Sequence, residues 1–163
     1  MTSTRVSRRV RAPRADVYRA LLDPVAVARW TVPDGMRCTV HELDPREGGR
    51  LRISLTYDAP AGAGKTTAHT DTYHGTFAKL VPDAEVVEVI EFETANPALQ
   101  GEMTLTFTLR DVDGATELVA VHDRLPPGLS PEYNELGWGM SLAKLAAWVE
   151  AGGRKASGAG ERR

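Results

Sequence analysis

The sequence predicts an α+β fold, in which a curved antiparallel sheet of about seven strands wraps around one long C-terminal helix. Three observations support this prediction. Short segments of alternating apolar and polar residues, separated by turn residues, fill the middle of the chain. The longest helical pattern comes last, and two short helical patterns follow the first strand. Consecutive hairpins favour an antiparallel sheet, and a sheet with one apolar face needs a helix to cover it.

The length and composition indicate one globular domain. The chain has 163 residues, a formal net charge of −2 and a single cysteine. We expect the domain to span residues 5–151, with residues 1–4 and 152–163 as flexible tails. The nearly balanced charge argues against nucleic acid as a partner. No apolar run approaches the roughly 20 residues of a membrane span, and no signal-peptide core is present, so we expect a cytoplasmic protein.

The N-terminal part predicts one strand and two short helices. Residues 5–11 form a strand candidate in which Val6 and Val10 are apolar. Pro13 then begins a helix whose apolar residues share one face. The Asp23-Pro24 pair ends this helix and caps a second one over residues 25–30.

The central part predicts six sequential strands. The clearest alternation has threonines between Met103, Leu105, Phe107 and Leu109, which is typical of a half-buried antiparallel strand. Proline, glycine and asparagine or aspartate mark the turns between strands. The predicted strands cover residues 37–43, 50–57, 70–80, 85–93, 102–110 and 116–123.

Residues 130–151 predict the long helix. Ser130 can cap it, Pro131 suits its first turn and Gly152 ends it. It carries two apolar stripes, so we expect it to pack on the sheet with one stripe and on something else with the other. The first stripe comprises Trp138, Leu142, Leu145 and Val149, and the second comprises Leu136, Met140, Ala143 and Ala147.

Two glycines, Gly137 and Gly139, lie inside this helix pattern, although each costs up to about 1 kcal/mol relative to alanine. Either they permit close packing of the helix on the sheet, or their missing side chains leave the volume of a cavity. The sequence leaves both explanations open.

Four motifs together resemble the START-like (SRPBCC) proteins. They are DPVAVARW at residues 23–30, REGG at 46–49, YHGTF at 73–77 and GWGMSLAKLAAWVE at 137–150. More narrowly, they resemble the homologues of the activator of the ninety-kilodalton heat-shock chaperone ATPase. The resemblance covers residues 6–151 and implies a helix-grip fold.

The resemblance also implies functions. START-like proteins bind lipids, sterols, polyketides or other apolar ligands between the sheet and the C-terminal helix, and a few are cyclases or aromatases. The eukaryotic activators carry an additional N-terminal chaperone-binding domain. Because this sequence lacks one, we do not expect a chaperone partner.

Nine residues are candidates for lining such a cavity, from the inward strand positions, the first helix stripe and the end of the second short helix. Trp30, which precedes a turn, is a candidate roof for the entrance. His122 shares a strand face with Leu118 and Ala120, where it is either a ligand-binding group or a satisfied core histidine. The candidates are Trp30, Leu55, Tyr57, Tyr73, Glu91, Phe107, His122, Trp138 and Leu142.

The sequence over residues 85–93 leaves the direction of its glutamates ambiguous. Glu91 follows Val87 and Val89 at two-residue spacing, so we expect it to point inward and Glu88 to point to solvent. An inward glutamate would need a hydrogen-bond partner or a raised pKa. A register error of one residue would reverse this expectation.

The densest polar cluster is HTDTYH, residues 69–74. His69 and Asp71 would need a distant third ligand, such as His122 or His41, to hold a metal. A solvated strand end is the simpler interpretation, so we expect no metal and no cofactor. Nucleotide-binding, zinc-protease and serine-hydrolase motifs are absent, and Cys38 has no evident neighbouring base.

We therefore rank three functions. The first is a protein that binds a small apolar or amphipathic ligand. The second is a protein-interaction or chaperone-cofactor-like module that uses the second helix stripe as an exposed patch. The N-terminal helices could instead cover that stripe, or it could form a homodimer contact. The third is an enzyme of the cyclase or aromatase type, which requires convergent polar groups such as His122 with Glu91 or Tyr73.

Overall fold

The computed structural model describes residues 2–32, 35–57 and 70–152, and these form the expected α+β arrangement. The α-helices and strands and their order agree with the prediction. The elements are β1 (Thr2–Val10), α1 (Arg14–Leu22), α2 (Pro24–Trp30), β2 (Met36–Leu43), β3 (Arg50–Tyr57), β4 (Thr70–Val81), β5 (Glu85–Phe92), the 3-10 helix η1 (Pro97–Leu99), β6 (Met103–Val112), β7 (Ala115–Leu125) and α3 (Pro131–Glu150).

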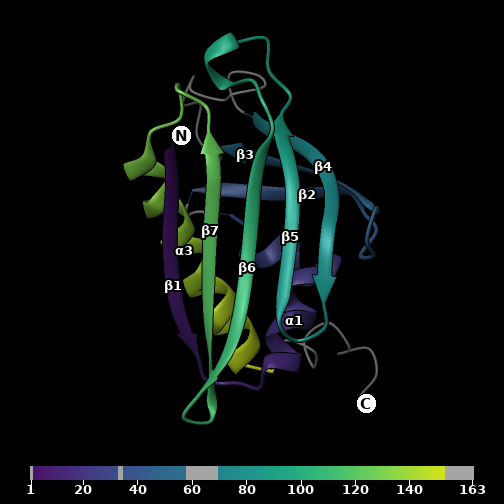
Figure 1. The fold of residues 1–163 in the computed structure, drawn as a ribbon, viewed down its shortest axis with the longest axis vertical. Coiled ribbons are helices and arrows are strands. Elements are labelled where there is room, and N and C mark those ends of the chain that lie inside the picture. The colour runs from purple at the N-terminus through teal and green to yellow at the C-terminus, as the bar shows by residue number, and fades with distance from the viewer. Residues whose placement is uncertain (1, 33–34, 58–69, 153–163) are drawn as a thin grey trace.

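The seven strands form one antiparallel sheet in the order β1-β7-β6-β5-β4-β3-β2. The sheet is strongly curved: β2 and β3 run across the direction of β1, β7 and β6 (Figure 1). At Gly75 in β4, a Cβ atom would lie 1.9 Å from the carbonyl oxygen of Val89 in β5. Only glycine therefore permits this close approach of the two strands.

The three α-helices lie on the concave face of the sheet, and α3 packs against β1, α1 and α2 (Figure 1). Within the first stripe of α3, Leu142 and Leu145 are fully buried. Within the second stripe, Leu136 is 56% exposed and Ala147 is also exposed. The described residues therefore leave part of the second stripe uncovered.

The predicted helix caps are confirmed. The Asp23 carboxylate accepts a hydrogen bond from the Val25 N–H, at 3.1 Å, and begins α2. The Ser130 hydroxyl accepts one from the Tyr133 N–H, at 3.3 Å, and begins α3. These side chains satisfy backbone donors that have no partner inside the helix.

Two details of the N-terminal and central predictions need correction. Residues 2–4 were expected in a tail, but β1 already begins at Thr2, and Thr4 is paired with His122 of β7. The segment after Asn96 contains the short helix η1 rather than a simple turn, with the Asn96 side chain accepting from the Ala98 N–H. Residues 153–163 lie outside the described part of the chain.

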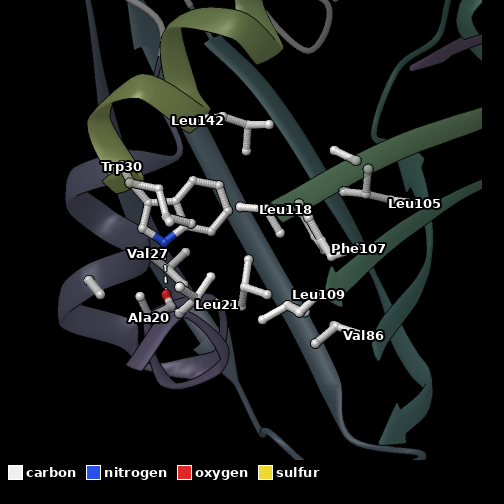
Figure 2. Close-up of a cluster of buried hydrophobic side chains, with 14 of the residues drawn as sticks. Ala20, Leu21, Val27, Trp30, Val86, Leu105, Phe107, Leu109, Leu118 and Leu142 are labelled. Carbon is white, nitrogen blue, oxygen red and sulfur yellow. Dashed lines mark hydrogen bonds between the residues drawn. The ribbon is translucent and has the colours of Figure 1, made fainter. Parts of the chain in front are cut away.

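The hydrophobic core occupies the end of the molecule where α1, α2 and the second half of α3 meet the sheet (Figure 2). Its labelled side chains come from α1 and α2 (Leu21 and Trp30), from α3 (Leu142) and from the strands (Val86 and Leu118, among others). The Trp30 indole N–H donates to the carbonyl oxygen of Ala20 at 2.8 Å, which ties α2 to α1. This packing fills one half of the concave face.

None of the described helices is both long enough and apolar enough to cross a membrane.

Candidate functional site

The other half of the concave face holds a cavity of about 590 Å³. It lies between the first half of α3 and one end of the sheet. Its walls come from the last residues of β3, β5 and β7 and from the first residues of β4 and β6. Because neighbouring strands are antiparallel, the end of one strand lies beside the beginning of the next. Together with Met36 at the start of β2, six strands therefore contribute side chains to the same edge of the hollow.

Apolar side chains make up much of the described lining. This is the composition expected of a small-molecule site, and the volume falls within the usual range of roughly 300–1,000 Å³. The apolar lining residues are Met36, Leu55, Ile90, Phe92, Leu99, Leu105, Leu129 and Trp138.

Five of the nine candidate residues line this cavity. Leu55 and Tyr57 lie at the end of β3, Tyr73 near the start of β4 and His122 near the end of β7. Trp138 reaches the cavity from α3.

Three other candidates face the concave side but lie in the packed core instead. Trp30, Phe107 and Leu142 are 3%, 1% and 0% exposed. In β6, Leu105 lines the cavity while Phe107, two residues further along, does not. The alternation gave the correct face of the strand, but it carries no information on where along the strand the hollow ends. Trp30 is a core residue rather than a roof over an entrance.

An aromatic row separates the core from the cavity. The rings of Trp30 and Phe107 meet edge to face with centroids 6.1 Å apart, and those of Phe107 and Trp138 do so at 5.7 Å. Edge-to-face contacts are a favourable geometry for aromatic rings. Phe107 therefore supports Trp138, which lines the cavity from α3.

The ninth candidate, Glu91, was assigned to the wrong face. It lies on the outer face of β5, where its carboxylate is 3.5 Å from the Nε2 of His74. Glu88 is instead the inward glutamate and is only 9% exposed. The inward face of β5 is Val86, Glu88, Ile90 and Phe92, so the register differs from our expectation by one residue.

Burial of Glu88 raises its pKa to about 8, because a carboxylate is poorly solvated in an apolar environment. Burial likewise raises the pKa of Cys38 to about 11. The pKa of Tyr73 is raised well above its ordinary value by burial and, secondarily, by the nearby acidic groups of Glu88 and Cys38. All three side chains are therefore neutral at pH 7.

His122 is held in one tautomer by its neighbours. The Trp138 indole N–H donates to the Nδ1 of His122 at 3.2 Å, so Nδ1 carries no proton. The Nε2–H therefore donates to the Met103 sulfur, also at 3.2 Å. The Asn134 amide nitrogen lies 3.2 Å from the same Nδ1, and the Asn134 oxygen accepts from the Thr4 hydroxyl.

Burial of His122 lowers its pKa to about 4, so the ring is neutral at pH 7. Both ring nitrogens are engaged in contacts between β7, β6 and α3. The side chain is consequently a satisfied polar residue at the edge of the cavity, and its contact with a ligand stays a prediction.

A second polar pair lies on the opposite side of the lining, where the Tyr57 hydroxyl donates to the Asp71 carboxylate at 3.3 Å. The pKa of Tyr57 is raised to about 12, first by burial and then by the charge of Asp71 and this hydrogen bond. Among the described lining residues, Asp71 is the one acidic side chain.

Sequence reasoning missed Thr31 and Ser141, both of which line the cavity. Thr31 directly follows Trp30 at the end of α2, and Ser141 follows Met140 in α3. Ser141 lies next to the first stripe of α3, so its spacing could have indicated an inward position. Thr31 carried no comparable signal, because its direction depends on how α2 packs.

Gly137 lines the cavity, whereas a Cβ atom at Gly139 would meet no heavy atom within 4 Å. The two helix glycines are therefore different. Gly137 lies where the explanation by cavity volume applies, and close packing does not explain Gly139.

The part of the chain that the structure describes contains no group of three or more histidine, cysteine, aspartate or glutamate side chains that could hold a metal. The His41 Nε2 lies 2.8 Å from the Ser54 hydroxyl, and the His74 Nδ1 lies 3.0 Å from Glu93. His69 lies outside the described residues. The suggested ligand set of His69, Asp71 and a distant histidine therefore includes a residue outside the described part of the chain and is not tested.

Comparisons with known proteins identify the relatives of this chain. The sequence model of the family described as "Activator of Hsp90 ATPase homolog 1-like protein" matches residues 11–150. The crystal structure of protein CV1439 from Chromobacterium violaceum is 34% identical, with a TM-score of 0.82 over 91% of this chain and 96% of that one. No curated protein matches the chain.

Two further solved structures share the fold at lower identity. The solution structure of the AHSA1-like protein from Aeromonas hydrophila is 18% identical, with a TM-score of 0.70 over 93% of this chain and 94% of that one. DynU16, a protein of the dynemicin biosynthetic locus, is 22% identical, with a TM-score of 0.62 over 92% of this chain and 48% of that one.

Proposed function

The chain belongs to the family of Activator of Hsp90 ATPase homolog 1-like proteins, and we propose that it binds a small, largely apolar molecule in the cavity between α3 and the sheet. The observation that carries the proposal is the hollow of about 590 Å³ on the concave face. A solidly packed concave face would have argued for a purely structural or interaction role. A cavity of this size accommodates a molecule of drug-like dimensions.

The helix sequence supports this proposal. Gly137 lines the cavity although glycine weakens a helix interior, and we infer that its missing side chain leaves space for a ligand. Tyr133 also lines the cavity and is 77% exposed, so it lies at the mouth of the hollow. An aromatic side chain at the mouth can contact an entering ligand.

The alternative functions have less support from the side chains. Of the pairs suggested for an enzyme, His122 has both ring nitrogens engaged, and Glu91 lies on the outer face. The interaction-module alternative rests on the exposed part of the second stripe of α3, centred on Leu136. The absence of a chaperone partner, the homodimer contact and the cytoplasmic location stay predictions.

The test uses the neutral fluorescent probe N-phenyl-1-naphthylamine and two matched variants of α3. Wild type is expected to bind the probe with saturation and a rise in fluorescence. Gly137→Leu is expected to weaken binding at least about tenfold, because a leucine side chain occupies the cavity. Fluorescence titration gives Kd for each protein.

Gly139→Leu is the control, because the same substitution there points into open space on the same helix. Like Gly137→Leu, it replaces a helix-weakening glycine by leucine, but it should leave the Kd for the probe within about twofold of wild type. Absence of saturable binding to wild type, or equal effects of the two substitutions, would contradict the proposal.

A further inference from the structure

We propose that Thr31 selects the ligand, and that the ligand is an uncharged molecule whose hydroxyl or carbonyl oxygen pairs with the Thr31 hydroxyl while its apolar body fills the cavity. This inference rests on the proposed binding function and deepens it by naming the chemical class of the ligand.

The main observation behind this inference is that the buried hydroxyl of Thr31 has no hydrogen-bond partner. Thr31 lines the cavity and is 8% exposed. Its Oγ1 is the one buried side-chain nitrogen or oxygen atom without a hydrogen-bond partner in the described ranges 2–32, 35–57 and 70–152. A buried hydroxyl that makes no hydrogen bond costs free energy, and native proteins seldom leave one. A bound molecule in the cavity would supply the missing partner.

The remaining polar groups of Thr31 are already used. Its N–H donates to the Val27 carbonyl oxygen at 3.1 Å, at the C-terminal end of α2. Its carbonyl oxygen accepts from the Ser141 hydroxyl at 3.1 Å, which ties the end of α2 to α3. The backbone is thereby fixed at the cavity wall, and the side-chain hydroxyl is the group left for a ligand.

The charges on the wall favour an uncharged ligand. The described lining contains no lysine or arginine, and His122 accepts a hydrogen bond from Trp138, which requires an unprotonated Nδ1. An anionic ligand would find no positive partner there and would share the cavity with the Asp71 carboxylate. A cationic ligand would compete with the Tyr57 hydroxyl, which already donates to Asp71.

The site accommodates either a hydroxyl or a carbonyl, because a threonine hydroxyl both donates and accepts. The apolar residues of the lining, including Leu55, Leu105 and Phe92, would contact the body of the same molecule. Most of the other polar side chains of the lining already have partners, so one unpartnered hydroxyl at a fixed position sets the orientation of the ligand and discriminates against analogues that lack the oxygen.

The test is a competition experiment on one molecular scaffold. The ability to displace N-phenyl-1-naphthylamine is measured for three competitors: biphenyl, 4-hydroxybiphenyl and biphenyl-4-carboxylate. Each is titrated against wild type, Thr31→Val and Thr31→Ser. Wild type is expected to bind 4-hydroxybiphenyl about five- to tenfold more tightly than biphenyl, and the carboxylate most weakly. Thr31→Val keeps the shape and removes the hydroxyl, so the preference should fall to twofold or less. Thr31→Ser keeps the hydroxyl and should keep the preference.

The outcomes separate this inference from the proposed function. If wild type binds the probe and biphenyl but shows no preference for 4-hydroxybiphenyl, or if Thr31→Val retains that preference, the role of Thr31 is wrong while the binding function stands. Tightest binding of the carboxylate would also overturn the inference. If the probe does not bind wild type at all, both proposals fail.

The ligand-free stability of Thr31→Val gives an independent readout. If the hydroxyl has no partner in the free protein, its replacement should leave the Tm unchanged or raise it. A clear fall in Tm would mean that the hydroxyl is already satisfied without a ligand, for example by water, and would remove the basis of the inference.

Discussion

Glu88 illustrates how the position of a single residue sets its chemistry. Its neighbours in the sheet are Phe77 on β4 and Leu105 on β6, so its carboxyl faces an apolar interior. The unfolded chain would solvate the same group, whose ordinary pKa is 4.5, whereas the folded pKa is about 8. Between these two values the folded protein binds a proton that the unfolded chain has lost. Stability therefore falls as the pH rises through this window.

Glu88→Gln is expected to remove this pH dependence, because glutamine is uncharged at every pH. Relative to wild type, the variant should gain stability between pH 4.5 and pH 8, at up to about 1.4 kcal/mol per pH unit. Urea unfolding at several pH values measures the difference. A constant difference between variant and wild type across this range would contradict the assignment.

The control for Glu88 lies on the same strand. Glu91→Gln removes a carboxyl from the exposed outer face and should change stability by no more than about 0.5 kcal/mol. The Glu88 and Glu91 variants must be compared because the titration of His122 changes the stability of every variant with pH in the opposite direction. Its pKa is lowered to about 4, so its contribution to stability is lost as the pH falls from about 6.5 towards 4.

At the scale of the element, α3 has two functions along its length. Its second half carries Leu142, Leu145 and Val149 into the core, and its first half carries Gly137 and Trp138 to the cavity. The change occurs near the middle of the helix, where Ser141 still lines the cavity and Leu142 no longer does. One helix therefore both holds the fold together and forms one wall of the candidate site.

Leu142→Ala is expected to cost about 2–5 kcal/mol of unfolding free energy, because a fully buried leucine leaves a void when truncated. Leu136→Ala removes the same atoms from the exposed side of the helix and should cost about 0.5 kcal/mol or less. Chemical denaturation of both variants makes the comparison. A cost below about 1 kcal/mol for Leu142→Ala would mean that this position faces water or a ligand instead of the core.

At the scale of the whole molecule, the curvature of the sheet creates the concave face on which both core and cavity lie (Figure 1). The pairing of β4 with β5 shifts register between Phe77 and Lys79, close to Gly75. Irregular pairing and a missing side chain are the usual means by which a sheet bends. Gly75 therefore contributes to the shape of the molecule and, through it, to the hollow.

Gly75→Ala is expected to destabilise the protein by about 3 kcal/mol or more, because the added methyl would lie 1.9 Å from the Val89 carbonyl oxygen. Thermal or chemical unfolding measures the loss. Gly139→Ala is the matched control, since its methyl meets open space and should stabilise α3 by up to about 1 kcal/mol. Equal stability of Gly75→Ala and wild type would show that the close approach is not needed.

The sequence by itself determined the α-helices and strands, the antiparallel character of the sheet and the caps at Asp23 and Ser130, because these depend on local periodicity and on residues a few positions apart. It also placed Leu55, Tyr73 and His122 on the correct faces.

Only the tertiary structure decided how far the core extends along each strand. Leu105 and Phe107 have the same alternation, yet Trp30 fills the space next to Phe107 and leaves the space at Leu105 open. The inward orientation of the Glu88 side chain and the unpartnered hydroxyl of Thr31 likewise result from packing between distant segments. A periodic pattern specifies a direction from the backbone, whereas a cavity is the volume that side chains from many elements together fail to fill.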